Sequence, residues 1–369
     1  MIAPLSGEQQ RAFEQVETFL NDRDRGLLRN QQYITIQGLA GVGKSFLATR
    51  IAEARPGALV CAYTGKAANV LREKAKAAGI HADISTIHSA IYLFKGMYID
   101  EVGKAQPMFS ERYGGGSGLQ QKIMLLDESS MIGARLADDI LDTGATVIAC
   151  GDPGQLPPVA DEQFFRRADI RLTEIHRQAL ESPIIRQAHN VRNTGRYQPD
   201  GYDFQVCGWV RDDTLLAADA MLCWKNKTRR GLNTRRRDIM GLPRMRLLAG
   251  EPVVCLRNSY EYQIWNGAIY PLAEDYEPGM SSLKIVGNDR IIFIHSPTVE
   301  DIDSDFETQQ YDDFMAPFAI GYALTTHKFQ GSEAAKVLIF DEYSREDGRS
   351  QWVYTAITRA SQSVIIVQA

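Results

Sequence analysis

The sequence lacks the features that mark secreted, metal-stapled and membrane proteins. Its five cysteines are an odd number, lie far apart and mostly stand in apolar runs, which predicts buried thiols in a reducing compartment. No His/Cys pair has the spacing of zinc ligands. The N-terminus lacks a basic segment followed by an apolar one, and no run approaches the ~20 apolar residues of a membrane span. We therefore expect a cytoplasmic protein that does not enter a membrane.

The sequence also lacks an excess of basic residues, because its formal net charge is -5 over 369 residues. Nucleic-acid binding would require a local basic surface, so the total charge neither supports nor excludes it. Hydrophobic residues make up 44% and charged residues 24%, which excludes wholesale disorder and fibrous architectures. At about 150 residues per domain, the length predicts two or three domains.

Strand-like and helix-like segments alternate along most of the chain. The chain opens with a helix over 5–20, for which Ser6 is the expected N-cap. Alternation of this kind predicts parallel sheets covered by helices, and the strands are too many for one sheet, so we predict two α/β domains in tandem. The expected strands are 33–37, 58–62, 123–126 and 146–150, followed by 220–224, 336–340 and 363–367.

Two segments interrupt this alternation. Residues 92–118 contain aromatic residues and a Gly-rich run, which predicts a short hairpin-like insertion. Residues 250–315 hold apolar runs at 252–256, 283–286 and 291–295, which predict a small antiparallel β unit. Within it, 300–313 has seven acidic residues and no basic one. That stretch is interpreted as a solvated loop, or as a docking segment for a basic partner.

A glycine loop stands between an expected strand and an expected helix, as the G-x-x-x-x-G-K-[ST] pattern requires. Its glycines let backbone N–H groups surround a phosphate, and the helix N-terminus adds a partial positive charge. Lys44 would bridge the β- and γ-phosphates and Ser45 would ligate Mg²⁺. The loop predicts a site for a nucleotide with Mg²⁺, lined by Gly38, Gly41, Val42, Gly43, Lys44 and Ser45.

Two further strands end in polar residues. The strand 123–126 is followed by Asp127 and Glu128, which are suited to holding Mg²⁺ and polarising the attacking water. The strand 146–150 leads into a turn rich in Gly and Pro, in which Gln155 could bond the γ-phosphate or the water. Ligands of α/β sheets bind outside such strand ends, so these residues predict a hydrolytic site, with Ser45 and Asp127 as the metal ligands.

Taken together, the segments resemble superfamily 1 DNA helicases of the RecD-like group, which includes the phage Dda helicases. The resemblance covers nearly the whole chain, although Phe329 replaces a residue that is usually small. In the first half it rests on LSGEQQRA (5–12), VCAYTGKAA (60–68), STIH (85–88), DESSM (127–131) and GDPGQLPP (151–158). In the second half it rests on LTEIHRQ (172–178), IWNG (264–267), YALTTHKFQGSE (322–333) and YTAITRA (354–360).

The resemblance implies two tandem RecA-like P-loop domains with ATP between them. The first, 1A, would comprise 1–91 and 119–170, with the insertion 92–118 (1B) as a strand-separating pin. The second, 2A, would comprise 171–249 and 316–369, with 250–315 (2B) as a small β-barrel plus the acidic loop. Because the motifs begin at Leu5 and end near the C-terminus, we expect a minimal, phage-type motor. We also expect a monomer in the cytoplasm, which is the host cytoplasm if a phage encodes it.

The resemblance also assigns residue roles. Lys44, Glu128, Gln155, Arg177 and Arg359 would be catalytic, the two arginines contacting the γ-phosphate. The adenine would be read by Gln9, and Gly331 and Glu333 would complete the nucleotide site. The nucleic-acid contacts would be Thr64, Lys66, Thr86, His88, Tyr92, Asn226, Asn266, Thr325, His327 and Lys328.

Several of these residues have a structural alternative. Thr86 and His88 could cap a helix, the arginines could form surface salt bridges, and Tyr92, with Phe94 and Tyr98, could form a small core. A basic cluster is interpreted either as a DNA contact or as a solvated helix face; it comprises Lys225, Lys227, Arg229, Arg230, Arg235, Arg236 and Arg237.

The expected function is an ATP-dependent DNA helicase that moves 5′ to 3′ on single-stranded DNA, with forked duplex DNA and a single-strand-binding, replication, repair or recombination protein as partners. The alternatives are a translocase without strong unwinding and an RNA helicase of the same superfamily. A GTPase-type switch is disfavoured because Asn226-Lys227-Thr228-Arg229 lacks the aspartate of a guanine reader.

Overall fold

The computed structural model describes residues 4–77, 79–99, 105–111, 119, 122–158, 161–175, 181–257, 259, 262, 264–287, 290–295, 297–302, 317–344 and 347–368. The chain forms two compact units, which are described separately. Unit 1 comprises Met1–Leu93, Phe109–Tyr197 and Ser350–Thr358, and unit 2 comprises Phe94–Met108, Gln198–Arg349 and Arg359–Ala369. Among the described residues, no helix has the length and apolar character needed to cross a membrane.

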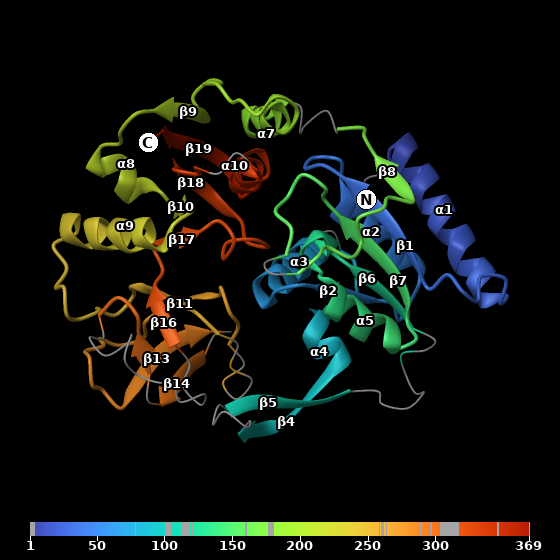
Figure 1. Ribbon diagram of the computed structural model, residues 1–369, viewed down its shortest axis with the longest axis horizontal. Helices are drawn as coiled ribbons and strands as arrows, with labels where there is room; N and C mark the ends of the chain where they lie inside the picture. The colour runs from blue at the N-terminus through green and yellow to red at the C-terminus, as the bar shows by residue number, and fades with distance from the viewer. Residues whose placement is uncertain are drawn as a thin grey trace. The chain divides into compact units, whose positions relative to one another are not determined.

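Unit 1 is built on a six-stranded sheet whose pairings are all parallel (Figure 1). The four strands that the sequence predicts in this unit are confirmed, with bounds shifted by no more than one residue, and β3 and β8 are additional strands. In spatial order the strands are β3 (Asp83–Thr86), β2 (Leu59–Ala62), β6 (Ile123–Leu126), β7 (Thr146–Gly151), β1 (Tyr33–Gly38) and β8 (Ile170–Leu172).

Helices cover both faces of this sheet, because its central strands send alternate side chains to two cores. In β6, Leu125 joins the core under α1 (Gly7–Asp24), α2 (Lys44–Ala54) and α3 (Gly65–Ala77). Its neighbours Met124 and Leu126 join the core under α4 (Ile87–Ile91) and α5 (Ala134–Asp142). Both faces are buried, so the strands are apolar throughout.

Local sequence signals set the ends of the first helix. Ser6 is the N-cap of α1, as expected: its side chain accepts a hydrogen bond from the Gln9 backbone N–H, and the Gln9 side chain accepts one from the Ser6 N–H. This reciprocal pair is a capping box. Unit 1 also contains η1 (Ser129–Met131), α7 (Pro183–Thr194) and most of α10 (Arg349–Ile357). The insertion segment forms a two-stranded sheet of β4 (Tyr92–Ile99) and β5 (Ala105–Glu111).

Unit 2 contains a second parallel sheet, of five strands, as the tandem α/β prediction requires. In spatial order they are β17 (Ala323–Thr325), β10 (Ala220–Cys223), β18 (Ala334–Asp341), β19 (Ala360–Gln368) and β9 (Phe204–Cys207). The helices α8 (Asp212–Ala217) and α9 (Asn226–Ile239) supply Leu215 and Leu232 to its core.

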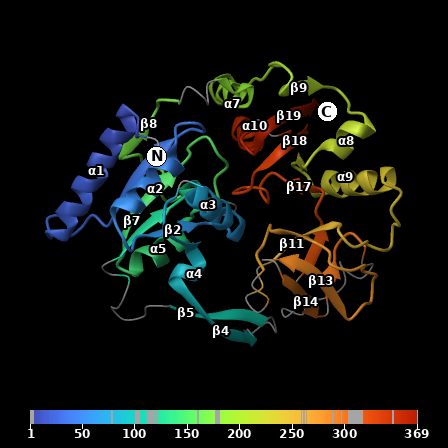
Figure 2. The ribbon, with the colours of Figure 1, turned by 180° about the vertical axis from the view of Figure 1, so that it is seen from behind.

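A smaller β unit lies within unit 2, where the sequence predicted one, and Figure 2 shows its strands grouped together. Antiparallel pairs predominate, but β15 and β16 pair in parallel. A bridge between Leu272 and Ile285 links its two sheets over one core. The strands are β11 (Pro252–Cys255), β12 (Ile269–Pro271), β13 (Ser282–Gly287), β14 (Arg290–His295), β15 (Thr298–Val299) and β16 (Pro317–Ile320).

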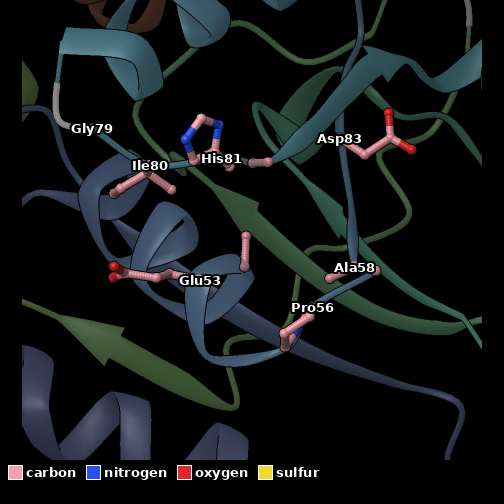
Figure 3. A pocket seen from close by; sticks show the side chains of 10 residues that line it. Glu53, Pro56, Ala58, Gly79, Ile80, His81 and Asp83 are labelled. Atoms are coloured by element: carbon pink, nitrogen blue, oxygen red, sulfur yellow. The ribbon is translucent and has the colours of Figure 1, made fainter.

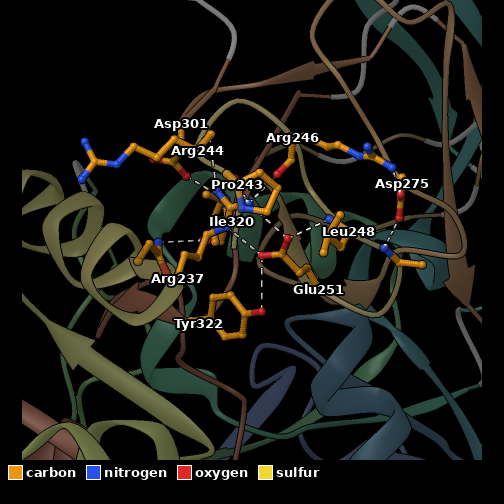
Figure 4. Close-up of polar contacts among 12 residues, drawn as sticks. Arg237, Pro243, Arg244, Arg246, Leu248, Glu251, Asp275, Asp301, Ile320 and Tyr322 are labelled. Carbon is orange, nitrogen blue, oxygen red and sulfur yellow. Dashed lines mark hydrogen bonds and ion pairs between the residues drawn. The ribbon is translucent and has the colours of Figure 1, made fainter. Parts of the chain in front are cut away.

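In the basic cluster around α9, Arg229 and Arg237 are neither DNA contacts nor part of a solvated helix face, because both are buried in ion pairs. Arg237 is 5% exposed at its side chain and pairs with Glu251 at 2.8 Å, and its guanidinium also donates to the Pro243 carbonyl (Figure 4). Arg229 is 2% exposed and pairs with Glu300 and Asp301. These two arginines are structural, and the acidic stretch begins with the counter-ions of Arg229.

We expect Glu251→Ala to lower the free energy of unfolding by about 3–5 kcal/mol, because it leaves the Arg237 guanidinium buried without its carboxylate. Asp238→Ala is the matched control. It breaks the pair between Asp238 and Arg244, whose side chains are 43% and 75% exposed, and should cost at most about 1 kcal/mol. Urea unfolding measures both values, and equal losses would contradict the structural role assigned to the buried pair.

Candidate nucleotide site and nucleic-acid interface

The glycine loop joins β1 to α2 in the backbone conformation that a phosphate cradle needs. Gly41 and Gly43 have φ of 88° and 77°, a region that other residues rarely adopt. A Cβ at Gly38 would lie 2.6 Å from Val42 Cγ2 and 2.8 Å from the Leu172 carbonyl oxygen. Because the N-cap of α2 is Gly43, no N-cap side chain occupies the first N–H groups of the helix. These groups form an anion-binding N-terminus.

The Lys44 ammonium lies over the start of this loop. Its Nζ donates to the carbonyl oxygens of Gly38 at 2.6 Å and Leu39 at 3.0 Å, and lies 3.6 Å from Asp152 Oδ2. The Lys44 side chain is 13% exposed, so its charge is largely shielded from solvent. Lys44 is therefore directed toward the start of the glycine loop rather than toward solvent.

The residues expected to hold Mg²⁺ lie together at the end of β6. Ser45 Oγ donates to Asp127 Oδ2 at 3.3 Å. Burial raises the pKa of Asp127, and the neighbouring charge of Glu128 raises it further, while Lys44 lowers it. A divalent cation here would stabilise the buried carboxylate, and a hydroxyl with a carboxylate is a donor set that suits Mg²⁺. The site therefore fits a Mg²⁺–nucleotide complex.

Glu128 has a strained backbone. Its φ is 54°, and it is the one non-glycine residue with positive φ among the described residues. Such strain costs on the order of 1–3 kcal/mol and concentrates at functional sites. Gln155, from the turn after β7, is 8% exposed, and its side-chain oxygen has no hydrogen-bond partner within the described ranges. The Gln155 amide suits contact with a bound phosphate or with water, and the Glu128 carboxylate suits accepting a hydrogen bond from water.

Gln9 supports the glycine loop from α1. It is 1% exposed, and its side-chain nitrogen donates to the carbonyl oxygens of Val42 at 3.3 Å and Gly43 at 3.4 Å. Adenine reading by Gln9 stays a prediction, but the capping box and these two bonds link the first helix to the loop.

Sequence reasoning gave no role to three residues that contact the same loops. Asp152 lies beside Lys44, and Tyr354 donates a hydrogen bond to Asp152 Oδ2 at 2.8 Å. The ring nitrogen Nε2 of His189 lies 2.9 Å from the Ala40 carbonyl oxygen. Asp152 and Tyr354 stand inside the motif segments of the sequence, where they could have been noticed, whereas no pattern marks His189.

The expected nucleic-acid residues of unit 1 follow β2 and β3. Thr64 Oγ1 accepts a hydrogen bond from the Ala67 N–H, and Thr86 forms a capping box at the start of α4. The helix-cap alternative is therefore confirmed for Thr86. The ring of His88 lies between those of Tyr63 and Tyr92, with centroids 6.4 and 5.8 Å away. Tyr92 is half-buried, and the side chains of Phe94 and Tyr98 lie outside the described residues.

The corresponding residues of unit 2 gather around β17. Thr325 ends this strand, and the half-buried residues His327 and Lys328 follow it. Asn266 and Gly267 approach this turn: a Cβ at Gly267 would lie 2.9 Å from the Lys328 carbonyl oxygen, and Gly267 has φ of 81°. Asn226 is exposed at the start of α9.

The expected nucleotide residues beyond those already described differ in their exposure to solvent. Arg359 is 6% exposed and donates to the Ser332 carbonyl oxygen at 3.4 Å, so it is not a surface salt-bridge residue. Gly331 has φ of 72°, and Glu333 is exposed. Arg177 lies outside the described residues.

A pocket of about 260 Å³ lies away from this site (Figure 3). Its lining, which includes Glu53, His81 and Asp83, comes from the end of α2 and the segments that lead into β2 and β3. The nucleotide residues follow the opposite ends of the strands. Within the described ranges, no group of three or more His, Cys, Asp or Glu residues could hold a metal ion.

The parallel sheet, the glycine loop and the carboxylates at neighbouring strand ends define a P-loop nucleotide-binding protein. Comparison with protein families agrees. Residues 5–211 match the family model of the AAA domain, and residues 321–367 match the UvrD-like helicase C-terminal domain.

Curated relatives are helicases and a conjugal transfer protein. The chain is 28% identical to the ATP-dependent RecD2 DNA helicase of Deinococcus radiodurans, over 90% of this chain and 46% of the relative. It is 29% identical to the ATP-dependent DNA helicase dda of Enterobacteria phage T4, over 48% of this chain and 41% of the relative. The chain thus spans less than half the length of these relatives.

Solved structures agree on the fold. Bacteroides Pif1 bound to single-stranded DNA has a TM-score of 0.57 and 18% identity, covering 99% of this chain and 92% of that one. A Pif1 structure from work on unwinding at forked duplex DNA has a TM-score of 0.58 and 19% identity, with the same coverage. The chain belongs to the AAA-domain family, and the comparisons support its resemblance to the RecD-like and Dda helicases of superfamily 1B.

Lys66 makes the nucleic-acid prediction testable by pH. Burial lowers the pKa of its ammonium to about 8. If the ammonium binds a DNA phosphate, single-stranded DNA affinity should fall as pH rises from 7 to 9, by up to about tenfold, because the free protein loses the proton that binding needs. Fluorescence anisotropy at constant ionic strength measures this.

Lys66→Arg is the matched control, because arginine keeps its charge over this range and should flatten the profile. Burial also holds the pKa of His88 and His327 below 6.5, so both are mainly neutral throughout. The pKa of Lys328 is lowered as well, so it accounts for any slope that remains in the variant. A wild-type affinity that is constant from pH 7 to 9 would contradict the Lys66 contact.

Gly267→Ala should weaken single-stranded DNA binding, because its Cβ displaces the backbone of Lys328. Gly279→Ala is the control, since it has φ of 85° and nothing within 4 Å of the added Cβ. Both variants should lose about 1–2 kcal/mol of unfolding free energy from the left-handed conformation. Only Gly267→Ala should lose DNA affinity, and equal affinities would disprove the proposed link to Lys328.

Proposed function

We propose that this protein is an ATP-dependent DNA helicase that moves 5′ to 3′ on single-stranded DNA and separates duplex strands. The observation that carries the proposal is the placement of Lys44, Ser45, Asp127 and Gln155 around one glycine loop. The relatives named as DNA helicases support the class of substrate, and the 5′ to 3′ direction follows the family resemblance.

In this proposal each residue has a distinct task. Lys44 neutralises charge on the β- and γ-phosphates, while Ser45 and Asp127 hold Mg²⁺, which supplies further neutralisation when bound. Glu128 accepts a proton from the attacking water, which Gln155 orients. Arg177 and Arg359 contact the γ-phosphate as the charge develops. Gln9, Gly331 and Glu333 complete the ATP site.

The domain partition belongs to the same proposal. Residues 1–91 with 119–170 form domain 1A and residues 171–249 with 316–369 form domain 2A, with 92–118 as the pin and 250–315 as the small barrel. The DNA contacts are proposed to be phosphate contacts, which hold any sequence equally. They involve Thr64, Lys66, Thr86, His88, Tyr92, Asn226, Asn266, Thr325, His327 and Lys328.

The test is strand displacement with ATP and Mg²⁺ on two partial duplexes that differ only in whether the single-stranded tail is 5′ or 3′. Unwinding of the 5′-tailed substrate alone is expected. Selective unwinding of the 3′-tailed substrate would overturn the direction. DNA-stimulated hydrolysis without unwinding would indicate a translocase, and stronger stimulation by oligo-U than by oligo-dT would indicate an RNA helicase.

Lys44→Ala should reduce DNA-stimulated ATP hydrolysis by about 100-fold or more, since one charged donor to the transferring phosphate is removed. The matched control is Lys76→Ala, at an exposed position in the last turn of α3. The control should hydrolyse ATP at the wild-type rate. Equal activity of the two variants would show that hydrolysis does not use this loop.

A further inference from the structure

The Tyr354 hydroxyl forms two hydrogen bonds beside the glycine loop, and the proposed chemistry gives this residue no role. The side chain comes from α10 and is 0% exposed. Its hydroxyl oxygen accepts a hydrogen bond from the Ala40 backbone N–H at 2.6 Å and donates one to Asp152 Oδ2 at 2.8 Å. One phenol therefore ties the glycine loop to the turn after β7.

Asp152 connects this phenol to Lys44. Its Oδ1 accepts a hydrogen bond from the Gly154 N–H at 2.9 Å, and its Oδ2 lies 3.6 Å from Lys44 Nζ. The Tyr354 hydroxyl, the Asp152 carboxylate and the Lys44 ammonium thus form one chain of contacts. Such buried networks hold each member in one orientation.

The turn that carries Gln155 is shaped to accept this helix. A Cβ at Gly154 would lie 2.8 Å from Tyr354 Cε1, so only glycine fits against the ring. On the other side of Gln155, the Leu156 N–H donates to Thr355 Oγ1 at 3.0 Å. Two adjacent residues of α10 therefore fix the backbone on both sides of Gln155.

We propose that Tyr354 is a positioning residue for the γ-phosphate end of the nucleotide site, acting through Ala40, Asp152 and the Gln155 turn. The inference deepens the proposed ATP-dependent function and rests on it. The hydroxyl uses its proton on Asp152 and accepts from Ala40, so it shapes the loop rather than binding the phosphate itself. The contacts lie at the start of the loop, beneath the Lys44 ammonium, and not at Gly43–Ser45, where α2 begins.

This placement predicts a selective defect in Tyr354→Phe, which keeps the buried ring and removes only the hydroxyl. Affinity for a non-hydrolysable ATP analogue should fall about tenfold, because the Ala40 N–H and Asp152 both lose a buried partner. Affinity for ADP should change less than about twofold, because the N–H groups at the start of α2 are unaltered. The kcat of DNA-stimulated hydrolysis should fall as well.

The experiment is competition against a fluorescent ADP by the two nucleotides, with and without Mg²⁺, together with steady-state hydrolysis. Tyr276→Phe is the matched control: this tyrosine is 1% exposed in the small β unit, and its hydroxyl donates to the Pro297 carbonyl oxygen at 3.4 Å. Thr355→Val tests the second anchor and should lower kcat with little change in ADP affinity. Thermal unfolding with saturating ADP checks that each variant is folded.

Each outcome either supports or overturns the positioning role of Tyr354. A Tyr354→Phe variant that binds the ATP analogue and hydrolyses ATP like the wild type would overturn this inference alone and leave the proposed function standing. Equal losses for the ATP analogue and ADP would make Tyr354 a structural residue, which also overturns it. A wild-type chain that binds the ATP analogue but never hydrolyses it would refute the helicase proposal, while the analogue-to-ADP ratio still tests Tyr354.

Discussion

The parallel alignment of β1, β6 and β7 is the constraint on which the nucleotide site depends. Gln37 is in register with Gly151, and Leu126 is in register with Ala149, so the three strands end at one edge of the sheet. The glycine loop, Asp127 and Asp152 follow these ends directly. Parallel strands place ligands at this edge because all their carboxyl ends meet there.

Because the strand ends meet at one edge, several carboxylates gather there around one ammonium group. Asp127, Glu128 and Asp152 follow neighbouring strand ends, and Lys44 is the ammonium near Asp127 and Asp152. Burial favours the neutral form of Asp127, so a cation at Ser45 and Asp127 would stabilise the charged form that hydrolysis chemistry needs. The Tyr354 hydroxyl stabilises the neighbouring Asp152 carboxylate, since it donates a hydrogen bond to it without adding charge. The site is therefore suited to a nucleotide that binds together with a divalent cation rather than to a bare anion.

Much of the fold could be predicted from the sequence, because buried parallel strands are short apolar runs and the Ser6 capping box is a local pattern. The glycine loop was predictable for the same reason, since its conformation depends on residues within one short segment. The β unit was predicted as antiparallel, but β15 pairs with β16 in parallel, and that pairing depends on a chain connection that no local signal marks. The basic cluster was misjudged at Arg229 and Arg237 because their partners lie outside α9, and no pattern along that helix marks them.

The sequence by itself determined the chemistry at the strand ends: Lys44, Ser45, Asp127 and Gln155 are each identified by neighbours a few residues away. Only the tertiary structure decided which residues hold these groups in place. The bond between the Ala40 N–H and Tyr354 joins residues 314 positions apart, and that between Tyr354 and Asp152 spans 202. Hydrogen bonds act only over about 3 Å, so such partners are set by how the elements pack and not by any pattern along the chain.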